Sequence, residues 1–157
     1  MPRRRESALA YALRLLRIRP RSQRELAERL RRRGYPPEEI ENTLRALREA
    51  GWLNDREFLE SFIRGHLRKL WSPWLIAQDL QRKGFSPEEF QDLLEELWDE
   101  ENAWLRLQEH ARRIHSLARN PEAFRRRLWG FLQRRGYPLE VFHRLVRAVE
   151  AGEPLEE

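Results

Sequence analysis

The sequence predicts an all-α protein built from three tandem three-helix repeats, about nine helices in all, forming an elongated, curved array. One eleven-residue pattern occurs three times, as LRRRGYPPEEI, LQRKGFSPEEF and LQRRGYPLEVF. The glycines of these copies, Gly34, Gly84 and Gly136, lie 50 and 52 residues apart, a spacing typical of repeat architectures. Apolar residues recur at helical spacing between the copies, and no segment shows the alternation of a strand. Because each repeat mainly contacts its neighbours, we expect an elongated shape.

Each copy of the pattern predicts the end of one helix, a tight turn and the start of another. Two cations precede the glycine, where the carbonyls of a helix C-terminus favour positive charge. The glycine can adopt the left-handed conformation that closes a helix. An aromatic residue follows, and then a proline, whose missing N–H costs little in a first helical turn. Glutamates after the proline favour the positive end of the new helix.

Start and stop signals for the individual helices stand in order along the chain. Small polar residues and prolines mark the expected starts. These are Ser7, Ser22 with Glu25 as a capping box, Pro37, Asn54 or Asp55, Ser72 with Pro73, Ser86 with Pro87, Asn120 with Pro121, and Pro138. The expected stops are Arg19–Pro20, Gly34, Gly51, Gly84, Gly136 and Gly152. Between them, the first helix would bury Leu9, Ala12, Leu13 and Leu16, and the seventh Ala103, Trp104, Leu107, Ala111, Ile114 and Leu117.

The boundary between the second and third repeats has the weakest signals for a helix end and a helix start. Asp99, Glu100 and Glu101 would oppose the dipole of the sixth helix if they ended it. We therefore expect the seventh helix to follow almost continuously or after one short break. The predicted domains are residues 1–51, 52–100 and 101–152, each a three-helix repeat, followed by a tail at residues 153–157.

Charge is distributed unevenly among these repeats. Residues 1–51 have a net charge of +7, residues 52–100 of −5 and residues 101–157 of +3. A basic module beside an acidic one suits a partner of mixed charge better than nucleic acid alone. Of the 31 basic residues 29 are arginine, a bias that genome composition or a warm habitat explains as well as binding does.

The composition also indicates where the protein works. The chain has no cysteine, which fits a reducing interior. The apolar run near the N-terminus is interrupted by Glu6, Arg14 and Arg17 and lacks a cleavage site, so it is not a signal peptide. No stretch approaches the ~20 apolar residues of a membrane span. We expect a cytoplasmic monomer that does not bind membranes.

No pattern for catalysis or for a cofactor stands out. The glutamate pairs Glu38–Glu39 and Glu88–Glu89 lie where helix N-termini favour negative charge. His110 and His115 are five residues apart, which does not align metal ligands on a helix, and no H-E-x-x-H or phosphate-binding glycine motif occurs. We therefore predict neither catalytic nor cofactor-binding nor metal-binding residues, and no enzyme activity.

The arginines are the candidate binding residues. Those in the repeated pattern are explained mainly by helix ends and solubility. The first repeat holds additional ones, including Arg3–Arg5 and Arg19, for which binding and plain solvation are equally good explanations. Guanidinium groups can contact phosphates or the carboxylates of a protein partner. The candidates are Arg14, Arg17, Arg21, Arg24, Arg31, Arg32, Arg82, Lys83, Arg134 and Arg135. The six tryptophans could stack on unpaired bases, but their spacing favours burial, least clearly for Trp71 and Trp74.

Three motifs give a more specific indication. They are S-x-x-E-L-x-x-x-L-x-x-x-G-Y from Ser22 to Tyr35, L-x-x-x-G-W-L-N-D-x-x-F from Leu47 to Phe58, and I-x-x-x-L-x-x-K-G-F from Ile76 to Phe85. In these motifs the chain resembles the RecX family of bacterial regulatory proteins. The resemblance covers most of residues 7–98, and residues 99–157 match mainly through the repeat.

This resemblance implies a helical protein that binds the RecA recombinase in the groove of its filament on DNA, usually inhibits its ATPase and strand exchange, and contacts DNA as well. It places the protein in DNA repair, recombination and the SOS response. The chain departs from the family at Leu59, where a small residue is usual, and at Leu70–Trp71–Ser72–Pro73, where a glycine-containing turn is common.

Two alternatives remain at this stage. One is a sequence-independent binder of single- or double-stranded DNA without a RecA role. The other is a scaffold for another protein, in which arginine only adds solubility.

Overall fold

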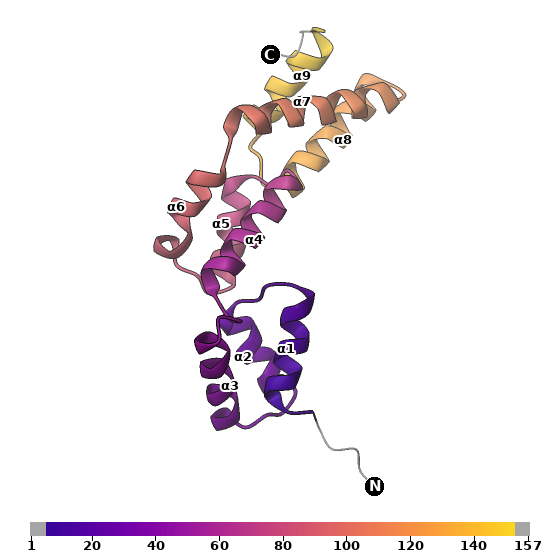
Figure 1. Cartoon of the computed structure of the whole chain (residues 1–157). Coiled ribbons are helices and arrows are strands. Elements are labelled where there is room, and N and C mark those ends of the chain that lie inside the picture. The colour runs from indigo at the N-terminus through magenta and orange to yellow at the C-terminus, as the bar shows by residue number, and fades with distance from the viewer. Residues whose placement is uncertain (1–5, 153–157) are drawn as a thin grey trace. The chain divides into compact units, whose positions relative to one another are not determined.

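Nine α-helices and no strand make up residues 6–152, the part of the chain that this computed structural model describes (Figure 1). The helices are α1 Ala8–Ile18, α2 Gln23–Arg32, α3 Pro37–Glu49, α4 Asp55–Arg68, α5 Pro73–Arg82, α6 Pro87–Leu97, α7 Glu100–Leu117, α8 Pro121–Arg134 and α9 Leu139–Glu150. The predicted all-helical fold of three three-helix repeats is confirmed.

By their internal contacts the helices group into two compact units. The first unit ends at Phe62 and the second begins at Ile63, so the division falls inside α4. In the first unit α1, α2 and α3 pack on one another; in the second, α5 packs on α6, and α7, α8 and α9 pack on one another. The predicted domain boundaries and the elongated, curved shape stay predictions, and the predicted tail at residues 153–157 lies outside the described residues.

All three copies of the repeated pattern form the same backbone turn. Gly34, Gly84 and Gly136 have φ angles of 88°, 98° and 82°, in the left-handed region that glycine adopts without strain. In each copy the N–H of the following aromatic residue donates to a carbonyl five residues back, over 3.2, 3.0 and 3.0 Å in chain order. The glycine N–H donates to the carbonyl three residues back. These two bonds define the Schellman motif, which confirms the predicted helix ends.

The turn after α4 has the same bonding pattern but no glycine. Leu70 has a φ angle of 65°, and the N–H groups of Leu70 and Trp71 donate to the carbonyls of Leu67 and His66. A left-handed leucine costs about 1–2 kcal/mol relative to an ordinary conformation. The side chain of Leu70 is buried in the core of the second unit, and this burial offsets the cost. This turn includes Leu70–Trp71, part of the segment in which the sequence departs from the resemblance described above.

Most of the predicted helix caps are present. Side-chain oxygens of Ser7, Ser22, Ser72 and Asn120 each accept from the backbone N–H three residues later, over 2.8 to 3.1 Å. Each such cap contributes about 1 kcal/mol to stability. Asn54 rather than Asp55 caps α4, because its side chain accepts from the N–H groups of Arg56 and Glu57.

Asp99 begins α7 instead of ending α6. Its carboxylate accepts from the Asn102 N–H over 3.0 Å, and Trp98 and Asp99 have extended backbone angles that separate the two helices. Glu100 and Glu101 therefore lie in the first turn of α7, where the helix dipole favours acidic side chains. The expected short break is present, and the conflict seen in the sequence disappears.

Two expected core positions are wrong. Leu9 of α1 is 41% exposed and Leu117 at the end of α7 is 77% exposed. Helix α1 turns Ala8, Tyr11, Ala12 and Leu15 inward instead, so its buried face is rotated relative to the predicted one. Two adjacent apolar faces fit the sequence of α1 almost equally well, and the packing of α2 and α3 selects between them.

Candidate binding surface

Four of the predicted binding residues are exposed and have no side-chain partner within residues 6–152. These are Arg17 in the last turn of α1, Arg24 and Arg31 on α2, and Arg134 at the end of α8. Arg24 and Arg31 are seven residues apart and therefore share one face of their helix. The guanidinium groups of these four residues are available for phosphate or carboxylate groups of a partner.

Four others are exposed but paired with carboxylates nearby. Arg14 contacts Glu6 over 2.9 Å and Arg32 contacts Glu28 over 2.7 Å. The hydrogen bond to Arg14 lowers the pKa of Glu6, and the same bond raises the pKa of Arg14. Arg82 and Lys83 both lie near Asp79, at 3.7 and 3.8 Å. Exposed pairs of this kind contribute little to stability, so a charged partner can displace them.

Arg21 is not on the surface, although the sequence suggested it as a binding residue. Its side chain is only 6% exposed, and its Nε donates to the Leu15 carbonyl over 3.2 Å. Its guanidinium also contacts Glu25, which binds Arg19 as well. Burial, and after it the charge of Arg19, lowers the pKa of Arg21. Because Glu25 binds these arginines, it does not complete the predicted capping box with Ser22.

Arg135 also has a structural role within the second unit. Its Nε donates to the Lys69 carbonyl over 2.9 Å, and its guanidinium lies 3.8 Å from the centre of the Phe131 ring. The backbone carbonyls of Arg135 and Gly136 accept from the N–H and the hydroxyl of Ser72. These bonds join the turn before α9 to the start of α5. Arg21 is therefore buried and Arg135 is half-buried and held by its own unit, and Arg3–Arg5 lie outside the described residues.

The tryptophans are buried only in part, and two of them are exposed. Trp52 is 50% exposed and Trp74 is 62% exposed, while Trp71, Trp98, Trp104 and Trp129 are half-buried. A tryptophan needs a large partner surface to be covered fully, and short helices of this size provide only part of it. Trp74 lies beside Gly136, close to where a Cβ atom on that glycine would be.

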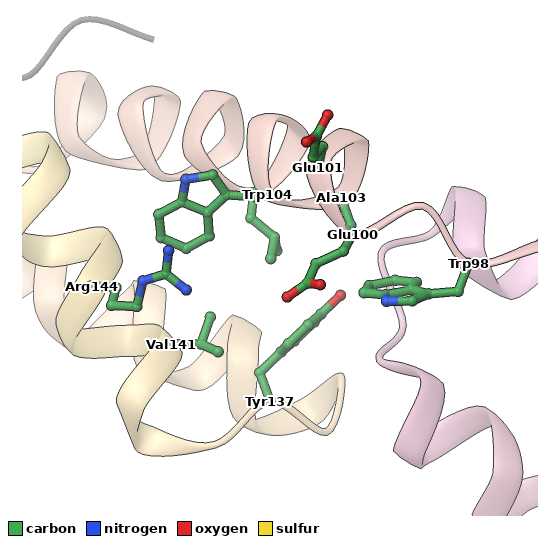
Figure 2. A pocket seen from close by; sticks show the side chains of 9 residues that line it. Trp98, Glu100, Glu101, Ala103, Trp104, Tyr137, Val141 and Arg144 are labelled. Atoms are coloured by element: carbon green, nitrogen blue, oxygen red, sulfur yellow. The ribbon is translucent and has the colours of Figure 1, made fainter. Parts of the chain in front are cut away.

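A hollow of about 280 Å³ opens in the second unit between the start of α7 and the start of α9 (Figure 2). Its wall is mainly apolar and includes Trp98, Trp104 and Val141. Arg144 lies over the Trp104 ring, with its guanidinium carbon 4.2 Å from the ring centre. Glu100 of α7 points into the hollow toward Tyr137, which comes from the turn before α9, whereas the Glu101 side chain points away from it.

Tyr137 is buried in this hollow without a hydrogen-bond partner for its hydroxyl. The residue is 8% exposed, and within the described residues no group accepts from or donates to the hydroxyl oxygen. Burial raises the pKa of Tyr137 to about 12, against the lowering effect of Arg106 and Arg135. Nothing in the sequence indicates this hollow beyond the aromatic residues themselves.

The histidines have aromatic neighbours. The ring of His110 stacks on Phe131 with centroids 4.0 Å apart, and His115 meets Phe124 edge-on. Burial, followed by the charges of Arg113 and Arg135, lowers the pKa of His110. Over residues 6–152 no three histidine or acidic side chains gather in a way that could hold a metal ion. No helix in that range is long and apolar enough to cross a membrane.

Comparison with known proteins identifies the three repeats separately. Three family models of RecX match the chain. Residues 8–47 match the first three-helix domain of RecX, residues 54–94 match the second, and residues 100–146 match the third. The chain is 39% identical over 150 residues to the regulatory protein RecX of Halorhodospira halophila, covering 94% of this chain and 88% of that protein. It is 34% identical over 138 residues to the regulatory protein RecX of Pseudomonas syringae pv. tomato, covering 86% of each.

Solved structures share the fold at lower sequence identity. The crystal structure of RecX from Lactobacillus salivarius superposes with a TM-score of 0.65 at 18% identity, covering 92% of this chain and 95% of that one. A second crystal structure, of a regulatory protein RecX, has a TM-score of 0.63 at 20% identity and covers 88% of this chain. At these identities the similarity concerns the fold alone.

Proposed function

The chain belongs to the RecX family of regulatory proteins, and we propose that it regulates the RecA recombinase by binding RecA filaments on DNA. The single observation that carries the proposal is the match of all three helical repeats, together spanning residues 8–146. We expect inhibition of the RecA ATPase and of strand exchange, with the protein lying in the filament groove. A bound protein shifts the filament between its states only by its different affinities for them.

Within this proposal, Arg17, Arg24 and Arg31 are the filament-facing residues of the first unit. They are exposed and unpaired within residues 6–152, and residues 1–62 carry 15 basic and 10 acidic residues, a net charge of +5. Guanidinium groups on α1 and α2 can contact DNA phosphates or acidic groups of a protein filament. Arg134 in the second unit is a further candidate of the same kind.

The direct test is the rate of ATP hydrolysis by RecA on single-stranded DNA, measured as this protein is added. A concentration-dependent fall in the rate, with saturation at a fixed ratio of protein to RecA, is the expected result. An unchanged rate, together with no retention of the protein on sedimented filaments, would contradict the proposal.

A triple variant, Arg17→Ala with Arg24→Ala and Arg31→Ala, tests the proposed surface. We expect inhibition to weaken by roughly tenfold at moderate salt and to depend less steeply on salt, because each lost phosphate contact reduces the salt slope by up to about 0.7–0.9. These side chains have no partners within the described residues, so the fold should be unaffected.

The matched control removes the same charge from the second unit by Arg119→Ala, Arg126→Ala and Arg127→Ala, at three other exposed positions. If both triple variants lose inhibition equally, net charge rather than a defined surface is responsible. If neither loses it, Arg17, Arg24 and Arg31 do not form the interface.

A second candidate function is sequence-independent DNA binding without RecA. The exposed rings of Trp52 and Trp74 favour it, because exposed aromatic residues and cations together form stacking surfaces for single strands. Titration of labelled single- and double-stranded DNA with and without RecA separates the two functions. Binding that RecA does not change supports the second, and binding to neither DNA nor filaments favours a scaffold for another protein.

A further inference from the structure

The hollow of Figure 2 adjoins an unusually acidic stretch of the second unit. Between Lys83 and Arg106 the chain has no basic residue and eight acidic ones. All eight are exposed, and none of them forms an ion pair within the described residues. We call this set the acidic strip: Glu88, Glu89, Asp92, Glu95, Glu96, Asp99, Glu100 and Glu101.

The acidic strip leads directly to the hollow. It runs along α6 and the first turn of α7, and its last two members both line the hollow, where Glu100 points inward and Glu101 outward (Figure 2). Uncompensated carboxylates attract a cationic partner and repel phosphates. The chemistry of this surface therefore favours a protein segment with lysines or arginines over a nucleic acid.

The hollow itself suits an apolar side chain. Trp98, Trp104 and Val141 are among the residues that make its lining mainly apolar, and its volume of about 280 Å³ is close to the lower end of the ~300–1,000 Å³ of small-molecule sites. A cavity of this size, open at one side and bordered by charge, resembles the pockets that hold single anchor residues at protein interfaces. One aromatic or branched aliphatic side chain is the appropriate ligand.

Tyr137 provides a polar contact inside the hollow. Its hydroxyl is buried without a partner in the described part of the chain, and in Figure 2 it points toward Glu100 and Trp98. A buried hydroxyl without an acceptor is unfavourable, so a ligand that supplies one gains affinity. A backbone carbonyl next to an inserted side chain is such an acceptor.

We propose that this hollow binds an apolar anchor side chain of a protein segment whose lysines or arginines lie on the acidic strip. The site uses none of the arginines of α1 and α2, and the proposal does not depend on whether the partner is RecA. It gives the protein a second, oppositely charged contact surface in addition to the basic one.

A peptide experiment without RecA tests the site directly. The probe is a ten-residue peptide, KKKGFLGKKK, and the control peptide has alanine in place of phenylalanine and leucine. Binding is followed by NMR on the full chain through the indole N–H signals of the tryptophans. We expect the probe to shift the signals of Trp98 and Trp104 at concentrations where Trp52 does not move, and the control peptide to bind at least about tenfold more weakly.

Single-residue variants test separately how the apolar anchor, the charge of the acidic strip and the Tyr137 hydroxyl contribute to peptide binding. Val141→Phe fills the hollow and should abolish the difference between the two peptides. Glu101→Lys, in the first turn of α7, should weaken probe binding about tenfold, whereas Glu122→Lys, at the matching exposed position of α8, should leave it unchanged. Tyr137→Phe should weaken binding about two- to tenfold without unfolding the protein.

Several outcomes would overturn the proposal. Equal binding of the two peptides would mean that only charge is recognised. Unchanged binding in Val141→Phe would place the anchor elsewhere, and an oligonucleotide that shifts Trp98 and Trp104 more strongly than the peptide would make nucleic acid the ligand. Because RecA takes no part, failure here leaves the ATPase result untouched, and the reverse also holds.

Discussion

The first and third copies of the repeated turn are nearly identical in sequence but differ in what surrounds them. Arg33–Gly34–Tyr35 lies in the first unit and Arg135–Gly136–Tyr137 in the second. In both, the arginine lies over an aromatic ring, Tyr11 or Phe131. In the first copy the Tyr35 hydroxyl donates to the Glu6 carbonyl; in the third the Tyr137 hydroxyl has no partner within residues 6–152.

The difference shows that one local motif can serve two purposes. The backbone bonds of the Schellman motif are the same in both copies, so the turn itself depends only on nearby residues. Contacts with distant segments then decide whether the tyrosine closes a core, as Tyr35 does, or lines a hollow, as Tyr137 does. The copy with the unpaired hydroxyl is also the one that forms the proposed docking site.

The largest effect is expected from Gly136→Ala. A Cβ atom at this position would lie 2.6 Å from the Ser72 hydroxyl oxygen and 2.7 Å from the Leu75 Cβ, and φ is +82°. Backbone strain of about 1–3 kcal/mol and overpacking of a similar size should lower the free energy of unfolding by roughly 3–5 kcal/mol. Urea denaturation measures this loss.

Gly51→Ala is the control for Gly136→Ala. Gly51 has a φ of +77°, but nothing lies within 4 Å of a Cβ atom there. Only the conformational cost of about 1–2 kcal/mol should remain. Equal losses in the two variants would show that the contact between Gly136 and the start of α5 does not constrain the turn.

Removing the hydroxyl should lower the free energy of unfolding at Tyr35 but not at Tyr137. Tyr35→Phe breaks a hydrogen bond to Glu6 and should lower the free energy of unfolding by about 0.5–1.5 kcal/mol. Tyr137→Phe removes a buried hydroxyl that has no partner, so stability should stay the same or rise by up to about 1 kcal/mol. Thermal unfolding of both variants beside the parent chain measures the difference. A clear loss of stability in Tyr137→Phe would indicate a partner for that hydroxyl and weaken the proposed site.

A pH dependence is also expected, and it is specific to the third copy. Because burial raises the folded-state pKa of Tyr137 to about 12 from an ordinary 10.0, the folded protein holds this proton more tightly than the unfolded chain does. The corresponding stability is fully present below pH 10 and is lost as the pH rises toward 12. Unfolding measured between pH 9 and 12 should therefore show a steeper loss in the parent chain than in Tyr137→Phe. Identical slopes would mean that Tyr137 titrates as a solvated phenol.

Much of the fold could be predicted because its signals are local. The glycine turns at 34, 84 and 136, the caps at Ser7, Ser72 and Asn120 and the helical repeat depend on hydrogen bonds between residues at most five apart. Such bonds are determined by residue type and spacing, which a sequence displays directly. For the same reason the family resemblance could be stated from three short motifs.

The exposure of the candidate binding residues was only partly predictable. Arg17, Arg24, Arg31 and Arg134 are exposed as expected, whereas Arg21 and Arg135 bind backbone carbonyls inside their own units. Six residues separate Arg21 from Leu15, and 66 separate Arg135 from Lys69. An arginine has the same sequence signature in either role, because burial depends on which segments pack around it.

The sequence by itself therefore determined the helices, their turns and the three-repeat plan, all of which arise from interactions between near neighbours in the chain. Only the tertiary structure decided which face of α1 is buried, which arginines stay on the surface, and that Trp98, Trp104 and Tyr137 line one hollow beside the acidic strip. These features depend on contacts between distant segments, and the geometry of packing selects among faces and rotamers that the sequence leaves nearly equal in energy.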